Sequence, residues 1–185
     1  MGKAGTLSPA KKVPTVWWSS PNPMSLKPNK STMAILVIGE FIFGLGDSLL
    51  IAAGVGNTPW TVLAEGIADT TEVWTIGETT FLVSVAVMFL WIPIKETPGI
   101  GTILNIIIIA LTIHVMVPIL PQPENPLVSI LMASSGIVLV GIGSSMYLTA
   151  NLGPGPRDGW MTGLQRTTGI PIGRVRIAIE TSVLV

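Results

Sequence analysis

Residues 103–111 read ILNIIIIAL, a continuous apolar run inside a longer apolar window that extends from Ile100 to Leu120. A transmembrane helix needs about 20 apolar residues to cross a bilayer core of about 30 Å, and this window has that length. The strands of a transmembrane β-barrel alternate apolar and polar residues over about ten positions, which this run does not do. The stretch therefore predicts a membrane-spanning helix.

Three more windows are apolar and long enough to cross a membrane: Met33 to Ala53, Ile76 to Ile94 and Leu127 to Ala150. A fifth begins near Ile172 and is still apolar at Val185, so we expect a truncated C-terminus and a further span beyond it. Turns rich in Pro and Gly separate the windows, where helices must end. The chain is therefore predicted to be an all-α membrane protein, a polytopic helical bundle with four full spans and the start of a fifth.

The composition of the 185 residues supports this class and excludes others. Charged residues make up 11% of the chain, against roughly 25% in a soluble domain, and the mean hydropathy is +0.68. So much apolar sequence excludes disorder, and ten basic residues balanced by ten acidic ones do not indicate a nucleic-acid-binding protein. The chain has no cysteine, which excludes disulfides and thiolate chemistry. We expect the lipid bilayer as its environment, with no bound metal and no cofactor.

The positions of the basic residues predict the orientation of the spans. Residues 1–32 are rich in Pro, Ser and Lys and are predicted to be a mobile tail, which the positive-inside rule places in the cytoplasm. Counting spans from there puts residues 95–99 and 151–171 inside and residues 54–75 outside. All ten basic residues then lie in or beside cytoplasmic segments, and the long outer loop carries only acids. We expect a multi-pass protein of the inner membrane with a cytoplasmic N-terminus.

The chain matches itself after a shift of 97 residues, mostly at Gly, Pro and other small residues; residues 44–46 (GLG), for example, fall on residues 141–143 (GIG). The first repeat covers residues 33–120 and the second, incomplete, covers residues 127–185. Each copy is predicted to hold three spans. Because three is odd, the second copy is inverted in the membrane, as in many secondary transporters. Small residues spaced by four in both copies also favour helix packing or a homo-oligomer through these faces.

Each half contains a Gly/Pro turn that opens a short amphipathic helix, at residues 56–60 (GNTPW) and 153–158 (GPGPRD). Proline suits the first position of a helix because its φ is already fixed near the helical value. A helix N-terminus presents free N–H groups and a partial positive charge, which can hold an anion. The alternative is an interfacial helix without a ligand. The candidate anion site of the second turn consists of Gly153, Gly155, Pro156, Arg157 and Asp158.

Four ionisable residues lie at membrane depth, where a charge is costly and marks a functional site by default. They are Glu40 and Asp47 in the first span, His114 in the third and Glu180 in the fifth. At about 1.5 Å per residue, Glu40 and Glu180 lie at one level and Asp47 and His114 at another. Such pairs are candidates to bind a cation, to move a proton or to contact a substrate. Alternatively, Glu180 belongs to a network with neighbouring arginines, and His114 is a packed, hydrogen-bonded residue.

Residues 44–47 (GLGD) spell the GxGD motif of intramembrane aspartyl proteases. That chemistry needs a second Asp on another span, so that one carboxyl acts as acid and the other as base. The remaining aspartates, Asp69 and Asp158, are predicted in loops on opposite sides of the membrane. The chain has no HExxH, GxSxG or P-loop motif. We therefore do not expect an enzyme.

Several motifs resemble those of the YczE-like bacterial membrane proteins, which are often grouped with the YitT type. The motifs are residues 59–63 (PWTVL), 98–102 (PGIGT), 152–164 (LGPGPRDGWMTGL), 168–172 (TGIPI) and 174–180 (RVRIAIE). The resemblance implies a multi-span bacterial inner-membrane protein with another span after Val185. Transport is the activity usually suggested for such proteins.

Three classes of function remain. The leading one is a transporter or permease of a small solute, which the inverted repeat, the Gly/Pro turns and the intramembrane acids favour. The second is a membrane scaffold or accessory protein that assists another complex, which the small-residue helix faces favour. An intramembrane enzyme is a distant third.

Overall fold

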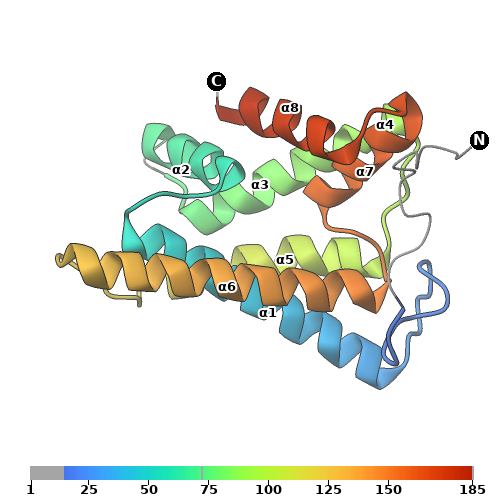
Figure 1. The fold of residues 1–185 in the computed structure, drawn as a ribbon, viewed down its shortest axis with the longest axis horizontal. Coiled ribbons are helices and arrows are strands. Elements are labelled where there is room, and N and C mark those ends of the chain that lie inside the picture. Colours follow the sequence, from blue (N-terminus) through green and yellow to red (C-terminus); the bar gives the residue numbers. More distant parts are fainter. Residues whose placement is uncertain (1–14, 72, 185) are drawn as a thin grey trace, which may run out of the picture.

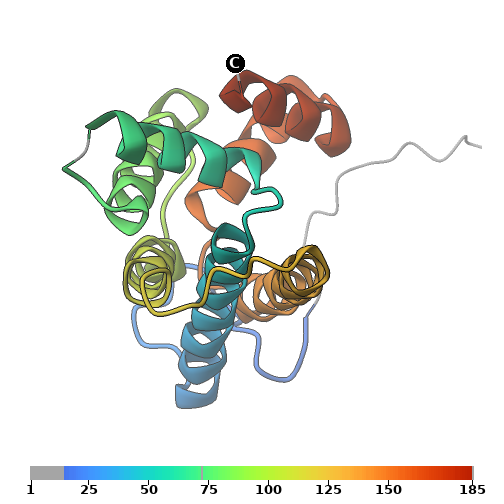
Figure 2. The same ribbon diagram turned by 90° about the vertical axis from the view of Figure 1, so that its left-hand side faces the viewer.

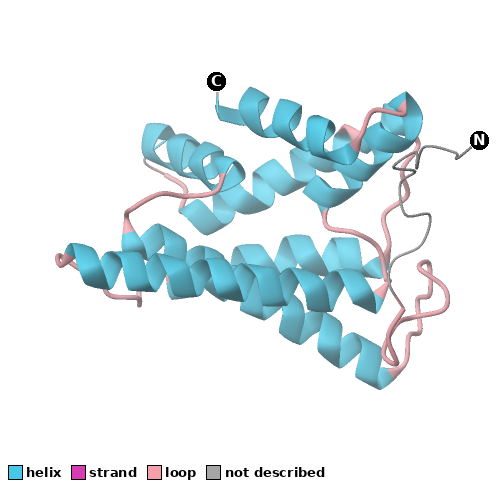
Figure 3. Ribbon diagram, in the orientation of Figure 1, coloured by secondary structure: helices cyan, strands magenta, loops and turns pink. Residues whose placement is uncertain are grey.

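The computed structural model describes residues 15–71 and 73–184, so residues 1–14 of the predicted tail lie outside the described part. The described residues form helices, turns and loops without a strand, which confirms the predicted all-α fold (Figure 3). In chain order the helices are α1 (Lys30–Ala53), α2 (Pro59–Thr71), α3 (Ile76–Phe89), α4 (Trp91–Ile94), α5 (Ile100–Met116), α6 (Pro126–Ala150), α7 (Pro156–Thr168) and α8 (Ile172–Leu184).

The helices form two layers, one of α1, α5 and α6 and one of α2, α3, α4, α7 and α8 (Figure 1, Figure 2). Three helical segments of the described chain are long and apolar enough to cross a membrane: α1, α3 continued by α4, and α6. The predicted span from Ile100 to Leu120 is shorter than expected, because α5 ends at Met116 and has 17 residues. Pro118 explains the early end, since it has no N–H for the next helical hydrogen bond.

Glycines form the contact where α1 crosses α6. A Cβ atom added at Gly46 would lie 2.7 Å from the carbonyl oxygen of Gly136, and one added at Gly143 would lie 2.5 Å from that of Gly39. These separations are too short for any side chain, so only glycine lets the two backbones meet here. The two contacts correspond to one another, because Gly136 follows Gly39, and Gly143 follows Gly46, by the same 97 residues.

The same spacing relates other elements of the two halves. The bounds of α7 lie 97 residues after those of α2, and α6 ends 97 residues after α1. Gly54 and Asn151, which close α1 and α6, are also 97 residues apart, and both adopt the left-handed conformation with φ of 66° and 54°. α8 begins 96 residues after α3. Both halves thus run from a long helix through a turn into a short helix and then a third helix.

The segment before α1 packs on the C-terminal end of α6. The Trp18 indole N–H donates to Thr149 Oγ1 (3.1 Å), and the Ser20 N–H donates to the carbonyl of Ala150 (2.9 Å). Asn151 Nδ2 donates in turn to the carbonyl of Ser20 (2.8 Å). These bonds fix residues 18–20, although the sequence predicted a mobile tail there. They form because the last carbonyls of a helix need donors from outside the helix.

Three segments that the sequence assigned to the cytoplasmic side lie together. The Gly101 N–H donates to the carbonyl of Leu152 (2.8 Å), which joins the start of α5 to the turn after α6. Thr97 lies 4.0 Å from the sulfur of Met24. With the contacts of Ser20, these bring the tail, the α4–α5 connection and the α6–α7 connection to one end of the molecule, on the right of Figure 1.

Candidate functional site

A cavity of about 430 Å³ lies between the two layers, where α2 and α7 begin. The connections before these helices turn back toward the middle of the molecule (Figure 1), so their first residues, Pro59 and Pro156, reach the cavity. Apolar side chains from both layers form part of the wall. The polar residues of the wall are Thr58, Ser84, Asn105, Ser144, Tyr147, Arg157, Asp158, Arg176 and Glu180.

The PGIGT motif at the start of α5 holds the turn that precedes α7. Thr102 Oγ1 donates to the carbonyl of Pro154 (2.7 Å) and accepts from the Gly99 N–H (3.1 Å). A Cβ atom at Gly99 would lie 2.2 Å from the carbonyl oxygen of Leu152, so the two backbones touch at this point. Gly153 adopts a φ of 106°, which a residue with a side chain rarely does, and lies against Thr102. The motif therefore fixes where α7 begins.

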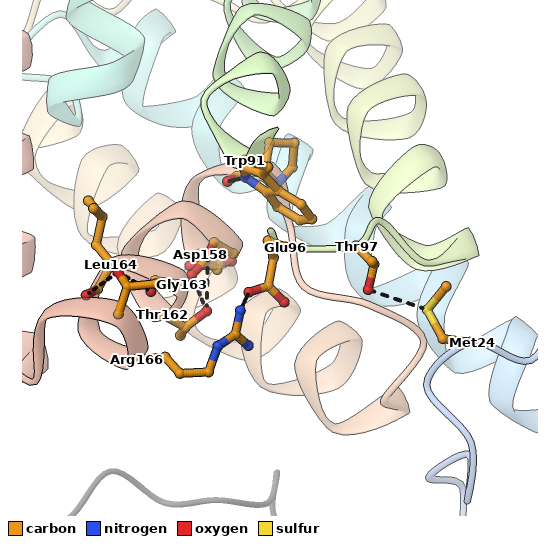
Figure 4. Close-up of polar contacts among 12 residues, drawn as sticks. Met24, Trp91, Glu96, Thr97, Asp158, Thr162, Gly163, Leu164 and Arg166 are labelled. Atoms are coloured by element: carbon orange, nitrogen blue, oxygen red, sulfur yellow. Dashed lines mark hydrogen bonds and ion pairs between the residues drawn. The ribbon is translucent and has the colours of Figure 1, made fainter. Parts of the chain in front are cut away.

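Two contacts with the α4 region hold α7 itself (Figure 4). The Trp91 indole N–H donates to the carbonyl of Pro156 (2.9 Å), and a Cβ atom at Gly159 would lie 2.1 Å from the Trp91 ring. The ring therefore packs directly on the backbone of the first turn of α7. Near the other end of the helix, Arg166 forms an ion pair with Glu96.

Arg157 is half-buried in the first turn of α7 and lies in the cavity wall. Its guanidinium carbon is 5.4 Å from the ring centre of Trp60 on α2, and Trp60 packs edge-on against Trp160. Burial lowers the pKa of Arg157, and attraction to Asp47 and Asp158 opposes the shift, so the guanidinium stays charged. Among the described residues it forms no ion pair. A positive charge therefore stands at the cavity without a carboxylate bound to it.

Asp158 accepts a hydrogen bond of 2.5 Å from the hydroxyl of Tyr147 on α6. Burial raises the pKa of Asp158, while this hydrogen bond and the charge of Arg157 oppose the shift. Asp158 lies in the first turn of α7, the short helix that the sequence predicted after the Gly/Pro turn, and this turn lines the cavity. The Asp47 carboxylate, by contrast, accepts no hydrogen bond from any described residue.

Asn105 on α5 also lines the cavity and is only 7% exposed. Within the described chain its amide nitrogen has no hydrogen-bond partner, which is costly for a buried donor. Its carboxamide oxygen faces the turn before α7, since a Cβ atom at Gly155 would lie 2.9 Å from it. Sequence reasoning did not place Asn105 in the site, although a lone amide within a run of isoleucines is a signal that could have found it.

The four predicted ionisable residues are not paired as expected. Glu180 lines the cavity but forms an ion pair with Arg176, one turn earlier in α8 (2.7 Å). Glu40 and Asp47 are buried and are not part of the cavity wall, and their carboxylates bond to no described residue. His114 is exposed near the end of α5 and bonds to a threonine before α3. The predicted Glu40–Glu180 and Asp47–His114 pairs do not form, because depth along a helix does not fix the face on which a side chain lies.

The small-residue faces differ between the halves. Gly44 is buried against α5, where an added Cβ atom would lie 2.8 Å from Thr112 Cβ. At the corresponding position of α6, Gly141 has no atom within 4 Å of an added Cβ. Gly44 therefore packs within the chain, whereas the surface of α6 at Gly141 is open to a partner such as the predicted second copy.

Comparison with known proteins assigns the family. Residues 30–185 match a family of unknown function, DUF6198. The chain belongs to this family. An uncharacterised protein of Haemophilus influenzae is 44% identical over 152 residues, which are 82% of this chain and 69% of the relative. The uncharacterised membrane protein YczE of Bacillus subtilis is 30% identical over 148 residues, 79% of this chain and 68% of the relative.

No solved structure matches the chain. The match to YczE confirms the resemblance that the sequence motifs indicated. Together with the apolar helices it identifies this chain as a membrane protein.

Proposed function

We propose that this membrane protein transports a small solute across the inner membrane, and that it is a multi-pass protein with a cytoplasmic N-terminus. The observation that carries the proposal is the cavity at the start of α2 and α7, because matched positions of the two halves form much of its wall. These pairs, 97 or 96 residues apart, are Phe43 and Val140, Thr58 and Gly155, Pro59 and Pro156, Trp60 and Arg157, and Ser84 and Glu180.

Contacts between matched positions support an inverted repeat. Around a two-fold axis, a residue on the axis touches its own counterpart, and other contacts come in swapped pairs. Arg157 stacks on its counterpart Trp60, and the glycine contacts between α1 and α6 are swapped pairs. Halves with an odd number of spans that are related in this way face opposite sides of the membrane. Rocking of one half against the other then exposes a central cavity to each side in turn.

The orientation rests on the basic residues, which the span count assigns to one side of the membrane. It requires the tail, the α4–α5 connection and the α6–α7 connection to share that side, and they meet at one end of the molecule. The ion pair between Arg166 and Glu96 joins α7 to the α4–α5 connection, and the span count assigns both to the cytoplasmic side.

Counterflow into liposomes tests the transport proposal. The purified protein is reconstituted and offered labelled small carboxylates, amines and neutral solutes, one class at a time, and we expect uptake of one class above that of protein-free liposomes. Ser144→Trp places an indole at the cavity wall and should abolish this uptake. Ser134→Trp lies on an exposed face of the same helix and should leave it unchanged.

Both variants must elute from a sizing column as the unmodified protein does, so that loss of uptake reports the cavity and not misfolding. Absence of uptake for every class would contradict transport. A stoichiometric partner recovered from native membranes would then favour the scaffold alternative. We assign no enzymatic activity to the cavity.

A further inference from the structure

We propose that the cavity binds the carboxylate of a small organic anion, held between Arg157, Asn105 and the N-termini of α2 and α7. This inference rests on the proposed transport function and names its substrate class.

The two helix N-termini supply positive potential at one place. α2 and α7 each have 13 residues, and both begin at a proline in the cavity wall. In the first turn of α2, which has no acidic residue, Thr58 Oγ1 accepts from the Thr61 N–H only (3.3 Å). The N-cap of α7 is Gly155, which offers no side-chain acceptor, and the one acid of that first turn, Asp158, accepts from Tyr147. First-turn N–H groups that no side chain caps are available to an anion.

Asn105 independently indicates a ligand. The residue lines the cavity on a different helix from either N-terminus, and its amide nitrogen is a buried donor without a partner in the described chain. A buried donor of this kind requires an acceptor. A carboxylate supplies acceptor oxygens only, so it satisfies Asn105 and the guanidinium of Arg157 at once.

The acids of the cavity wall are already engaged, which argues against a cation. Asp158 accepts the hydroxyl of Tyr147, and Glu180 accepts from Arg176. Arg157 forms no such pair with any described residue, and Trp60 covers one face of its guanidinium. The charged side chain of the wall that pairs with no described residue is thus a donor, Arg157.

The remaining wall and the size of the cavity favour an organic anion over an inorganic one. A volume of about 430 Å³ exceeds what a small inorganic anion fills. The wall also contains apolar side chains, which would cover a hydrocarbon body of a few carbons. Its apolar residues include Phe43, Ile109, Val140, Leu148, Met161 and Ile179.

A set of isosteric probes tests the charge requirement on the unmodified protein. Thermal unfolding of the purified full chain in detergent is followed with isovalerate, isovaleramide, isoamylamine or sulfate. We expect isovalerate to raise the midpoint in a saturable way and the other three to have no saturable effect. Saturable binding of the amide or the amine equal to that of isovalerate would overturn the inference, and binding of sulfate without isovalerate would reduce the site to an inorganic-anion site.

Matched arginine variants then test whether the carboxylate binds at Arg157. Arg157→Gln should weaken isovalerate binding at least tenfold, and Arg157→Lys, which keeps the charge, should weaken it less. Arg174→Gln, an exposed arginine of α8 outside the cavity, should bind as the unmodified protein does. Unchanged affinity in folded Arg157→Gln would overturn the inference.

The outcomes separate the inference from the proposed function. Isovalerate binding without counterflow leaves the site standing and contradicts transport. Counterflow of a neutral or cationic solute without isovalerate binding supports transport and contradicts the carboxylate site.

Discussion

The two halves of this chain share a backbone course but differ in what surrounds it. The turn before α7 is fixed by hydrogen bonds from the start of α5, whereas Gly54 and Gly56, in the turn before α2, have no atom within 4 Å of an added Cβ. The chemistry differs as well, because the second half places Arg157 and Asp158 where the first half has Trp60 and Thr61. The first half thus supplies an aromatic surface and the second half the charge that rests on it.

This difference teaches that a repeat can conserve geometry while dividing chemical roles. Gly and Pro positions recur in both halves because backbone contacts and helix starts depend on them. The side chains that face the cavity can differ between the halves, because each half packs against the other half and not against a copy of itself. Substitutions at matched positions show which constraints the two halves share and which belong to one half.

The largest expected effect concerns the constraint that both halves share. Gly46→Leu and its counterpart Gly143→Leu each force a side chain into the backbone of the facing helix. The loss of folding free energy should exceed about 3 kcal/mol, the upper range for overpacking, because backbone cannot move aside as a side chain can. Neither variant should elute as a single folded species in detergent. A folded Gly143→Leu would show that the α1–α6 contact is looser than described.

The next prediction uses matched glycines whose surroundings differ. Gly44→Ala meets Thr112 of α5 and should lower the unfolding free energy by about 1–3 kcal/mol. Gly141→Ala meets nothing and should leave stability unchanged or slightly raised, because alanine favours the helix. The midpoints of thermal unfolding measure both. Equal losses in the two variants would contradict the difference between the small-residue faces.

A smaller loss is expected where the α6–α7 turn is tied to α5. Thr102→Val removes the hydrogen bond to the carbonyl of Pro154 and the acceptor for the Gly99 N–H. The loss should be about 1–2 kcal/mol, since two partners remain unsatisfied. Thr167→Val, whose hydroxyl bonds only to its own helix, is the control and should change stability little. An unchanged midpoint of thermal unfolding for Thr102→Val would mean that the turn keeps its conformation without these hydrogen bonds.

The smallest expected effect is a pH dependence at Asp158, which the matched Thr61 lacks. Because burial raises its pKa, the folded state binds its proton more tightly than the unfolded state. The stabilisation that this bound proton gives the folded state is therefore fully present below the ordinary Asp pKa of about 4 and is lost as the pH rises through the folded pKa. The midpoint of the unmodified protein should fall relative to that of Asp158→Asn over this rise. Parallel curves for the two proteins would contradict the shifted pKa.

Much of the fold follows from local sequence. Apolar length predicts the spans, and Pro59 and Pro156 predict the starts of two short helices. Pro118 also predicts the early end of α5, although apolar length alone extended that span to Leu120. Local chemistry of this kind acts within a few residues, so it can be read without knowing the packing.

The site follows from sequence only in part. The turn residues around Arg157, which the sequence indicated as a candidate site, line the cavity. The sequence could locate this turn because the start of a helix depends on local sequence. Glu40, Asp47 and His114 do not meet the predicted partners, since the face of each side chain depends on how the helices rotate against one another. Asn105 gains its role only because α5 packs beside the turn before α7.

The central claim is that the two halves are matched and face opposite sides of the membrane. Thr70 and Thr167 are matched, exposed positions of α2 and α7, and the chain has no native cysteine. Thr70→Cys and Thr167→Cys are therefore labelled with a membrane-impermeant maleimide, before and after the cells are opened. We expect that Thr70→Cys reacts in intact cells and that Thr167→Cys reacts only in opened cells. Labelling of both from the same side would contradict it.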